Sequence, residues 1–218
     1  MYIGGRFGFG FGGTDTQVNP LPDPVSFGAL MPTTLESSFG GPFGGVYAGY
    51  DQQYGQLIAG IVADFNWGNV TSSERSSPII QNNGTPFSVS SFIDSNQEIE
   101  WFGSLRGRAG VQLNRIVLYA TGGLAYGNVT YSALTRFPPV GDFEYPAYLS
   151  DTKWGWTLGG GLEVAITDCL TWKIEYLYYD LGSESFVANP VPANPPFQVS
   201  YDWETTFHTI NTGLAFHF

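Results

Sequence analysis

The chain has 218 residues, of which 12% are charged and 17% aromatic, and its formal net charge is −11. A soluble domain has about a quarter of its residues charged, so this surface is short of charge, and the acidic balance argues against nucleic acid as a partner. The single cysteine, Cys169, excludes an internal disulfide and a cysteine-based zinc cluster. Apolar runs are a few residues long, whereas a transmembrane helix needs about 18. We expect one domain over residues 1–218.

Eight segments alternate between apolar and small or polar residues with a period of two, which is typical of β-strands. The predicted strands cover residues 2–13, 44–52, 55–68, 98–113, 116–131, 152–166, 169–181 and 202–218. Long connections alternate strictly with short turns, and the long ones are 14–43, 69–97, 132–151 and 182–201. This order is typical of an up-and-down barrel in a membrane, which has short turns at one rim and long loops at the other.

The first predicted strand, MYIGGRFGFGFGG, places Ile3, Phe7 and Phe9 on one side, and Arg6 with a row of glycines on the other. The chain opens without the charged and apolar regions of an export signal. We expect that a signal peptide has been removed, because the rest of the sequence points to an exported protein.

Odd- and even-numbered positions of a strand face opposite sides of the sheet, and this parity assigns the two faces of the later strands. In 98–113, Leu105 and Ala109 share one side, while Glu100, Arg106 and Arg108 share the other. An arginine that faces lipid near the bilayer centre costs about 2–4 kcal/mol, so the charged side must face the lumen. The same argument applied to every strand predicts a luminal charge network of Arg6, Asp64, Glu100, Arg106, Arg108, Glu163, Lys173 and Glu175, with Lys153 on the same side.

This network is interpreted as structural, because the interior of an eight-stranded barrel is just filled by side chains and charges buried there must pair. Two alternatives stay open. Arg106 and Arg108 could be the selectivity residues of a narrow ion path, and Glu163 with Glu175 could form a catalytic carboxylate pair, although a filled barrel offers it no cleft.

Two histidines, His208 and His217, are the remaining candidates for catalysis or metal binding. His208 points outward with no serine nearby on its face, so we expect an interfacial polar aromatic and not a lipid hydrolase. His217 lies too far away to complete a metal site with it. We therefore predict a protein without catalytic residues, metal or cofactor.

Outward aromatic residues gather near strand ends, as in the aromatic girdles of membrane barrels. The predicted interface residues are Trp67, Trp101, Trp154, Trp156, Tyr178 and Trp203 toward one rim, and Trp172 toward the opposite rim.

The last strand sets the orientation. Ile210, Leu214, Phe216 and Phe218 alternate, and this ending resembles the signal by which bacterial outer-membrane barrels are recognised for insertion. We expect the barrel-assembly machinery as a partner during insertion. The predicted fold is thus an all-β, eight-stranded antiparallel up-and-down transmembrane β-barrel with short periplasmic turns and four long extracellular loops.

The long connections are strongly acidic, with two bases, Arg75 and Arg136, against nine acids. Solvation explains most of this charge, but acidic loops also require divalent cations beside lipopolysaccharide, or engage a basic partner. Aromatic residues there, Phe43, Tyr145 and Tyr148 among them, could contact a partner protein. The nine acids are Asp15, Asp23, Glu36, Glu74, Asp94, Asp142, Glu144, Asp151 and Glu184.

Four motifs point to a family: WFGSLRGRAG (101–110), LYATGGLAYG (118–127), GWTLGGGLE (155–163) and WKIEYLYYDLG (172–182). With the ending at 211–218, they resemble the alphaproteobacterial outer-membrane immunogenic protein, or small-porin-like, family of OmpA-like barrels. The match is dense over 98–218 and weaker over 1–68.

The resemblance implies an integral outer-membrane protein, in contact with lipid and lipopolysaccharide, that is not an enzyme. Its expected function is to support envelope integrity and to present surface loops for adhesion or partner binding. Three alternatives remain: a narrow porin-like channel for small solutes, a lipid A-modifying enzyme, and a subunit or anchor of a larger envelope assembly.

Overall fold

The computed structural model describes residues 1–21, 33–79, 90–137, 143–191, 193 and 198–218, and most of them are in strands. No helix within these ranges is long and apolar enough to cross a membrane. The strands in chain order are β1 (Tyr2–Leu21), β2 (Thr33–Tyr54), β3 (Leu57–Ser76), β4 (Phe92–Leu113), β5 (Ile116–Phe137), β6 (Phe143–Ala165), β7 (Leu170–Ala188) and β8 (Gln198–His217).

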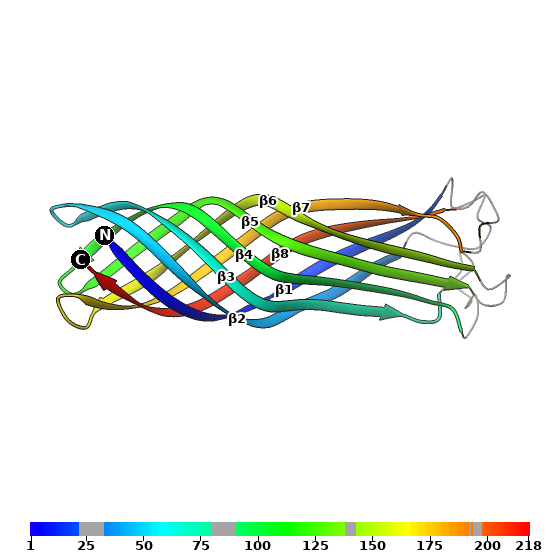
Figure 1. The fold of residues 1–218 in the computed structure, drawn as a ribbon, viewed down its shortest axis with the longest axis horizontal. Helices are drawn as coiled ribbons and strands as arrows, with labels where there is room; N and C mark the ends of the chain where they lie inside the picture. Colours follow the sequence, from blue (N-terminus) through cyan, green and yellow to red (C-terminus); the bar gives the residue numbers. More distant parts are fainter. Residues whose placement is uncertain (22–32, 80–89, 138–142, 192, 194–197) are drawn as a thin grey trace.

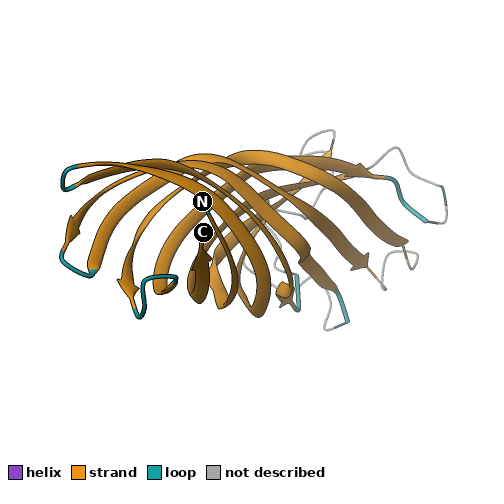
Figure 2. Ribbon diagram, turned by 60° about the vertical axis from the view of Figure 1, so that its left-hand side comes forward, coloured by secondary structure: helices purple, strands orange, loops and turns teal. Residues whose placement is uncertain are grey.

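Each strand pairs antiparallel with the next, and β8 pairs with β1, so the sheet closes into a barrel (Figure 1). The predicted all-β, antiparallel architecture is confirmed. The short connections and both chain ends lie together at one end of the barrel (Figure 2), where Phe218 N donates a hydrogen bond to Met1 O at 3.1 Å. We call the part of the barrel next to this end the near half and the rest the far half; the level of Trp67 and Trp156 separates them.

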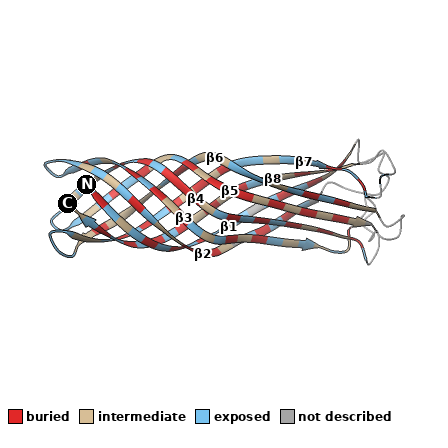
Figure 3. Cartoon of the chain, viewed as in Figure 1, coloured by how far each residue is buried: buried red, intermediate tan, exposed pale blue. Residues whose placement is uncertain are grey.

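In the near half, most outward side chains are apolar, and the inward ones are charged, small or aromatic. Phe7, Ile61 and Leu158 are 62%, 60% and 58% exposed, whereas Arg106 is 1% exposed. Figure 3 shows the resulting alternation of exposed and buried residues along each strand. Such a continuous exposed apolar surface is stable against hydrocarbon and not against water.

In the far half, the polarity of the two faces is reversed. Val70 and Ile93 point inward and are buried, while Asn96, Ser150 and Ser185 are exposed on the outside. An antiparallel sheet with an apolar inner face and a polar outer face is suited to water. The far half is therefore built as a water-exposed extension of the barrel wall.

This reversal corrects the predicted loop lengths. Most of 14–43, 69–97, 132–151 and 182–201 is strand: β1 continues to Leu21, and β4 begins at Phe92. The outward positions there hold serine, threonine and asparagine, residues that also favour turns, so the continued alternation was missed. Of the nine acids assigned to loops, seven lie in strands, and Asp23 and Asp142 lie outside the described residues.

A bulge in β4 corrects the predicted face of Glu100. The β4–β5 register shifts between Ile99 and Trp101, and the β3–β4 register shifts between Trp67 and Val70. One extra residue inverts the parity of everything beyond it. Glu100 is consequently exposed on the outer surface, and its predicted luminal position is wrong, while Ile99 is fully buried inside.

In the far half, beyond the level of Trp67 and Trp156, the barrel wall divides into two sheets. The β6–β7 ladder ends at Trp156↔Asp180, and the β2–β3 ladder ends at Gly40↔Thr71. The other ladders continue to the far strand ends, for example to Ser76↔Ile93 and Leu21↔Gln198. Among the described residues, β3–β4–β5–β6 and β7–β8–β1–β2 thus form two sheets of four strands, which enclose one apolar cluster.

Candidate functional site

The centre of the near half is an ionic cluster that four different strands contribute to. Arg6 on β1 contacts Asp64 on β3 at 2.5 Å and Glu175 on β7 at 3.3 Å. Arg106 on β4 contacts the same two carboxylates at 3.0 and 3.1 Å. All four side chains are at most 1% exposed. Each carboxylate is therefore held between two arginines, across the full width of the barrel.

Neutral groups complete the hydrogen bonding of this cluster. Asn66 Oδ1 accepts from Arg6 Nε at 2.7 Å, and Tyr119 OH donates to Glu175 Oε1 at 2.9 Å. Ser104 Oγ donates to Asp64 Oδ2. Buried charges are tolerated when they are paired and their remaining hydrogen-bonding capacity is satisfied, and ionised partners make the stronger hydrogen bonds.

A second ionic group lies closer to the near end. Arg108 donates two parallel hydrogen bonds of 2.9 Å to Glu163, and its guanidinium carbon lies 4.1 Å from the ring centre of Tyr119. Asp51 Oδ2 approaches Arg108 at 3.6 Å. Lys173 Nζ lies 3.7 Å from Glu175 and 3.7 Å from the Tyr47 ring centre. The two groups together block the middle of the lumen of the near half.

The structure places seven of the eight predicted luminal charges inside the barrel, and Glu100 is the exception described above. Lys153 also points inward, but it lies in the far half and contacts Glu184 instead of the network. The prediction missed Asp51, although its parity with Tyr47 on β2 was a signal that could have found it.

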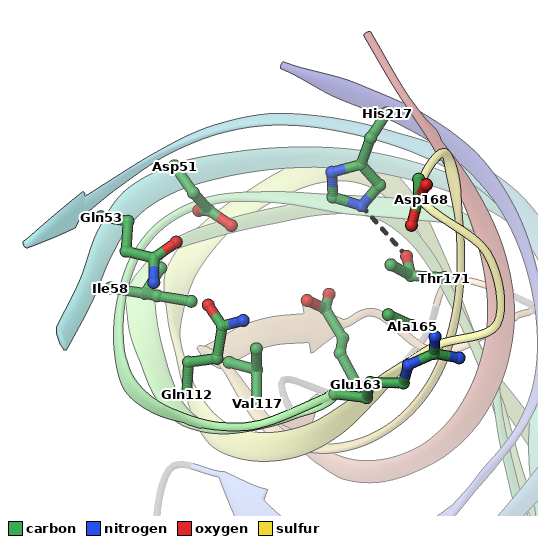
Figure 4. Close-up of a pocket in the computed structure, with 11 residues that line it drawn as sticks. Asp51, Gln53, Ile58, Gln112, Val117, Glu163, Ala165, Asp168, Thr171 and His217 are labelled. Atoms are coloured by element: carbon green, nitrogen blue, oxygen red, sulfur yellow. Dashed lines mark hydrogen bonds between the residues drawn. The ribbon is translucent and has the colours of Figure 1, made fainter. Parts of the chain in front are cut away.

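Below Arg108 and Glu163, the near end opens as a vestibule of about 370 Å³ (Figure 4). The carboxylate of Glu163 and the ring of His217 point into it, and His217 Nε2 lies 3.1 Å from Thr171 Oγ1. Glu163, which pairs with Arg108, lines this space together with Asp51. Among the described residues, no group of His, Cys, Asp and Glu side chains has the arrangement of a metal site.

The hypothesis of a carboxylate pair is disfavoured by these contacts. Glu163 is neutralised by Arg108, and Glu175 by Arg6 and Arg106. A catalytic pair needs two carboxyl groups that face one substrate, whereas each of these carboxylates is held in ion pairs of its own.

The far half is filled mainly by aromatic and apolar side chains, with buried hydroxyl groups such as those of Thr16 and Ser95 hydrogen-bonded among them. Phe102 packs edge-on against Phe207 with ring centres 5.3 Å apart, and Tyr201 stacks on Trp203 at 5.6 Å. Trp203 is fully buried and donates from Nε1 to Ser95 Oγ at 3.0 Å. The predicted place of Trp203 in the outer girdle is therefore wrong. The odd-numbered residues of this part of β8 face inward, and Trp203 shares that side with Phe207. Tyr145, predicted as a loop contact residue, is buried in the same core.

The other predicted interface aromatics lie on the outer surface in two belts. Trp67, Trp154 and Trp156 are 56%, 70% and 48% exposed at the boundary of the two halves. Trp101, half-buried there, stacks on Phe65 at 5.6 Å, and Tyr178 lies 5.3 Å from Trp156. Trp172, 38% exposed, lies near the opposite end and donates to Thr212 Oγ1 at 2.8 Å.

His208 also lies on the outer surface, in the aromatic belt at the boundary of the two halves. Its Nδ1 is 2.6 Å from Tyr176 OH, and its ring stacks on Phe11 at 5.7 Å. These neighbours are aromatic, as expected of an interfacial residue. The terminal aromatics Phe216 and Phe218 are 53% and 72% exposed at the near end.

Comparison with known proteins decides the family. The model of the family described as outer membrane protein beta-barrel domain matches residues 1–218. This chain belongs to that family.

Relatives and solved structures agree with this outer-membrane barrel assignment. The chain is 35% identical to the 31 kDa outer-membrane immunogenic protein of Brucella melitensis over 222 residues, which cover 100% of this chain and 79% of that protein. It is 33% identical to the 22 kDa outer membrane protein of Rhizobium leguminosarum over 145 residues, 63% of this chain and 55% of that protein. The predicted family resemblance and the integral outer-membrane location are confirmed.

A solved structure shows the same fold. The outer membrane protease OmpT of Escherichia coli superposes on this barrel with a TM-score of 0.56 and 10% identity, covering 100% of this chain and 97% of that one. At this identity the likeness concerns the fold alone.

The charged surface of the outer-membrane barrel is partly paired. Arg75 lies 3.4 Å from Asp94, and Arg136 lies 3.2 Å from Glu144. Both bases of the predicted acidic loops are thus in contact with a carboxylate, and the outer surface of the far half keeps an acidic excess.

Proposed function

We propose that the chain is a non-enzymatic, eight-stranded transmembrane barrel that stabilises the outer membrane and presents its far half outside the cell for adhesion or partner binding. In this arrangement the short turns and the vestibule face the periplasm. The observation that carries the proposal is that both halves of the interior are filled, the near half by paired charges and the far half by an aromatic core.

A filled interior favours a structural protein over a channel. A permeating ion would have to separate Arg106 from Asp64 or Glu175, contacts of 3.0 and 3.1 Å in side chains at most 1% exposed. It would then have to cross the apolar cluster that contains Phe102 and Phe207. Desolvation of an ion in such surroundings costs several kcal/mol or more.

The outer surface suggests how the barrel sits in the membrane. The belt with Trp67 and Trp154 would lie at the outer headgroups, and Trp172 at the periplasmic ones. Above the outer belt, exposed polar residues such as Asn96 and Ser150 would meet the sugars of lipopolysaccharide, with divalent cations between its phosphates and exposed carboxylates. The alternating ending with Phe216 and Phe218 would serve the barrel-assembly machinery during insertion.

The experiment compares cells with and without the protein. We expect cells without it to become more sensitive to detergent and to large antibiotics, and to lose attachment to host or matrix surfaces. Purified protein in a planar bilayer should give no steady conductance. A stable open channel that disappears on changing Arg106 and Arg108 would establish the porin alternative, and an altered lipid A mass spectrum would establish the enzyme.

A further inference from the structure

The β6–β7 boundary in the far half has two strand edges without a ladder between them. The ladder ends at Trp156↔Asp180, and among the described residues backbone hydrogen bonds between the two sides recur at Glu144 and Val191 alone, with N···O distances of 3.0 and 2.8 Å. Between these points, residues 146–155 pair with β5 and residues 183–188 pair with β8. Figure 1 shows β6 and β7 diverging in this region. We call these two stretches the β6–β7 seam.

The seam is built into the local sequence. The β7–β8 register shifts between Asp180 and Ser183, and Gly182 adopts a φ of 78°, a conformation that favours glycine. Gly182 N donates to Asp180 Oδ1 at 2.9 Å and fixes this bend. Beyond it, β7 follows β8 and leaves β6. The side chains of Lys153 and Glu184 meet across the opening, where a backbone ladder would otherwise hold the strands.

Unpaired strand edges are templates for another strand, and strand addition to a sheet edge is an established mode of peptide recognition. We propose that the β6–β7 seam is a docking site for an extended, positively charged segment of a partner polypeptide, which adds as a strand along residues 146–155. The proposal deepens the proposed function, on which it rests for the outward placement of the seam.

The charges and side chains at the seam specify the chemistry of this segment. Four carboxylates lie along its two sides and ends: Glu144, Asp151, Asp180 and Glu184. Two cations contact three of them, Arg136 with Glu144 and Lys153 with Asp151 and Glu184, so these side chains together keep two negative charges in excess. This balance favours a basic segment. On the outer face of β6, beyond the belt that contains Trp154, Tyr148 is 69% exposed and lies two residues from Ser150. Exposed aromatic residues of this kind are frequent anchors of interfaces.

The test uses the purified full chain in lipid nanodiscs and a synthetic octapeptide. Valine occupies every second position of this peptide, and lysine and threonine occupy the positions between. Two matched peptides serve as controls: the same sequence with alternate backbone nitrogens methylated, and a version with glutamate in place of lysine. Amide hydrogen exchange followed by NMR reports on residues 146–155. We expect the basic peptide to slow the exchange of alternate amides in this stretch at least tenfold, and both control peptides to have no effect.

Two variants test the charge argument. Asp151→Asn should weaken binding of the basic peptide about threefold or more, whereas Glu36→Gln, which changes an exposed carboxylate on β2, three strands from β7, should leave it unchanged. Absence of protection at millimolar peptide, equal binding of the methylated peptide, or protection elsewhere in the barrel would each overturn the proposal. Because the assay uses isolated protein, the seam can bind even if the cell attachment experiment fails, so the two failures are distinguishable.

Discussion

Substitution of Arg106 by methionine tests the ionic cluster most sharply. Among the luminal side chains described above, four cations (Arg6, Arg106, Arg108, Lys173) stand against four carboxylates (Asp51, Asp64, Glu163, Glu175). Arg106→Met leaves one buried negative charge in excess. Arg106 donates three hydrogen bonds of 3.0–3.2 Å to Asp64 and Glu175, each worth about 1.5–3 kcal/mol.

The full sum is not expected to be lost, because Arg6 still contacts both carboxylates. Breaking a buried ion pair typically costs about 3–5 kcal/mol, and we expect this loss in the free energy of unfolding. Urea unfolding in lipid vesicles, followed by tryptophan fluorescence, measures it. With a slope near 2 kcal/mol per M, the midpoint should fall by roughly 2 M.

The control is Arg75→Met, because Arg75 is 59% exposed and contacts Asp94 at 3.4 Å. A surface pair of this kind contributes less than about 1 kcal/mol. Adding Glu175→Gln to Arg106→Met removes the excess charge, so the double variant should lose less stability than the sum of the single variants. A loss for Arg106→Met no greater than that for Arg75→Met would refute the reasoning.

Three further predictions follow from the two halves. Leu158→Arg, on the outer face of the near half, should lower the free energy of unfolding in lipid by about 2–4 kcal/mol. Ser150→Arg in the far half should lower it by less than about 0.5 kcal/mol. Equal losses for the two variants in urea titrations would contradict the assigned membrane boundary. Trp203→Ala, in the apolar interior of the far half, should lower the free energy of unfolding by about 3–5 kcal/mol. It should also speed amide hydrogen exchange in the far half more than in the near half. Equal acceleration in both halves would argue against a separate core in the far half. Gly159→Ala should fold in low yield, measured by the heat-dependent shift on gels, because a Cβ at Gly159 would lie 2.0 Å from Tyr176 O; Gly5→Ala, which meets no atom within 4 Å, is the control.

The sequence predicted the near half well because a single physical rule governs it. Outward positions must be apolar in lipid, so parity alone assigns Arg6, Asp64 and Glu175 to the interior. The alternation could not predict which charged side chains form ion pairs. The contacts of Asp64 and Glu175 with two arginines depend on the relative shift of strands that are far apart in the chain.

The far half was harder to predict, for two reasons. Its outer face is rich in serine and threonine, which favour turns as well as strands, so the sequence pattern predicts loops where the structure has long strand ends. The bulge between Ile99 and Trp101 adds one residue without an obvious signal in the sequence, and it moved Glu100 from the predicted lumen to the surface. The division into two sheets follows from ladder ends such as Trp156↔Asp180, which no local pattern reveals.

The central claim is that one barrel wall meets hydrocarbon in its near half and water in its far half. Paramagnetic relaxation in nanodiscs tests it directly, with a nitroxide on the lipid chains and a gadolinium chelate in the water. We predict that the lipid nitroxide broadens the amides of Leu105 and Leu158 while the chelate broadens those of Asn96 and Ser185. Broadening of all four by the lipid probe, or of all four by the chelate, would contradict the account.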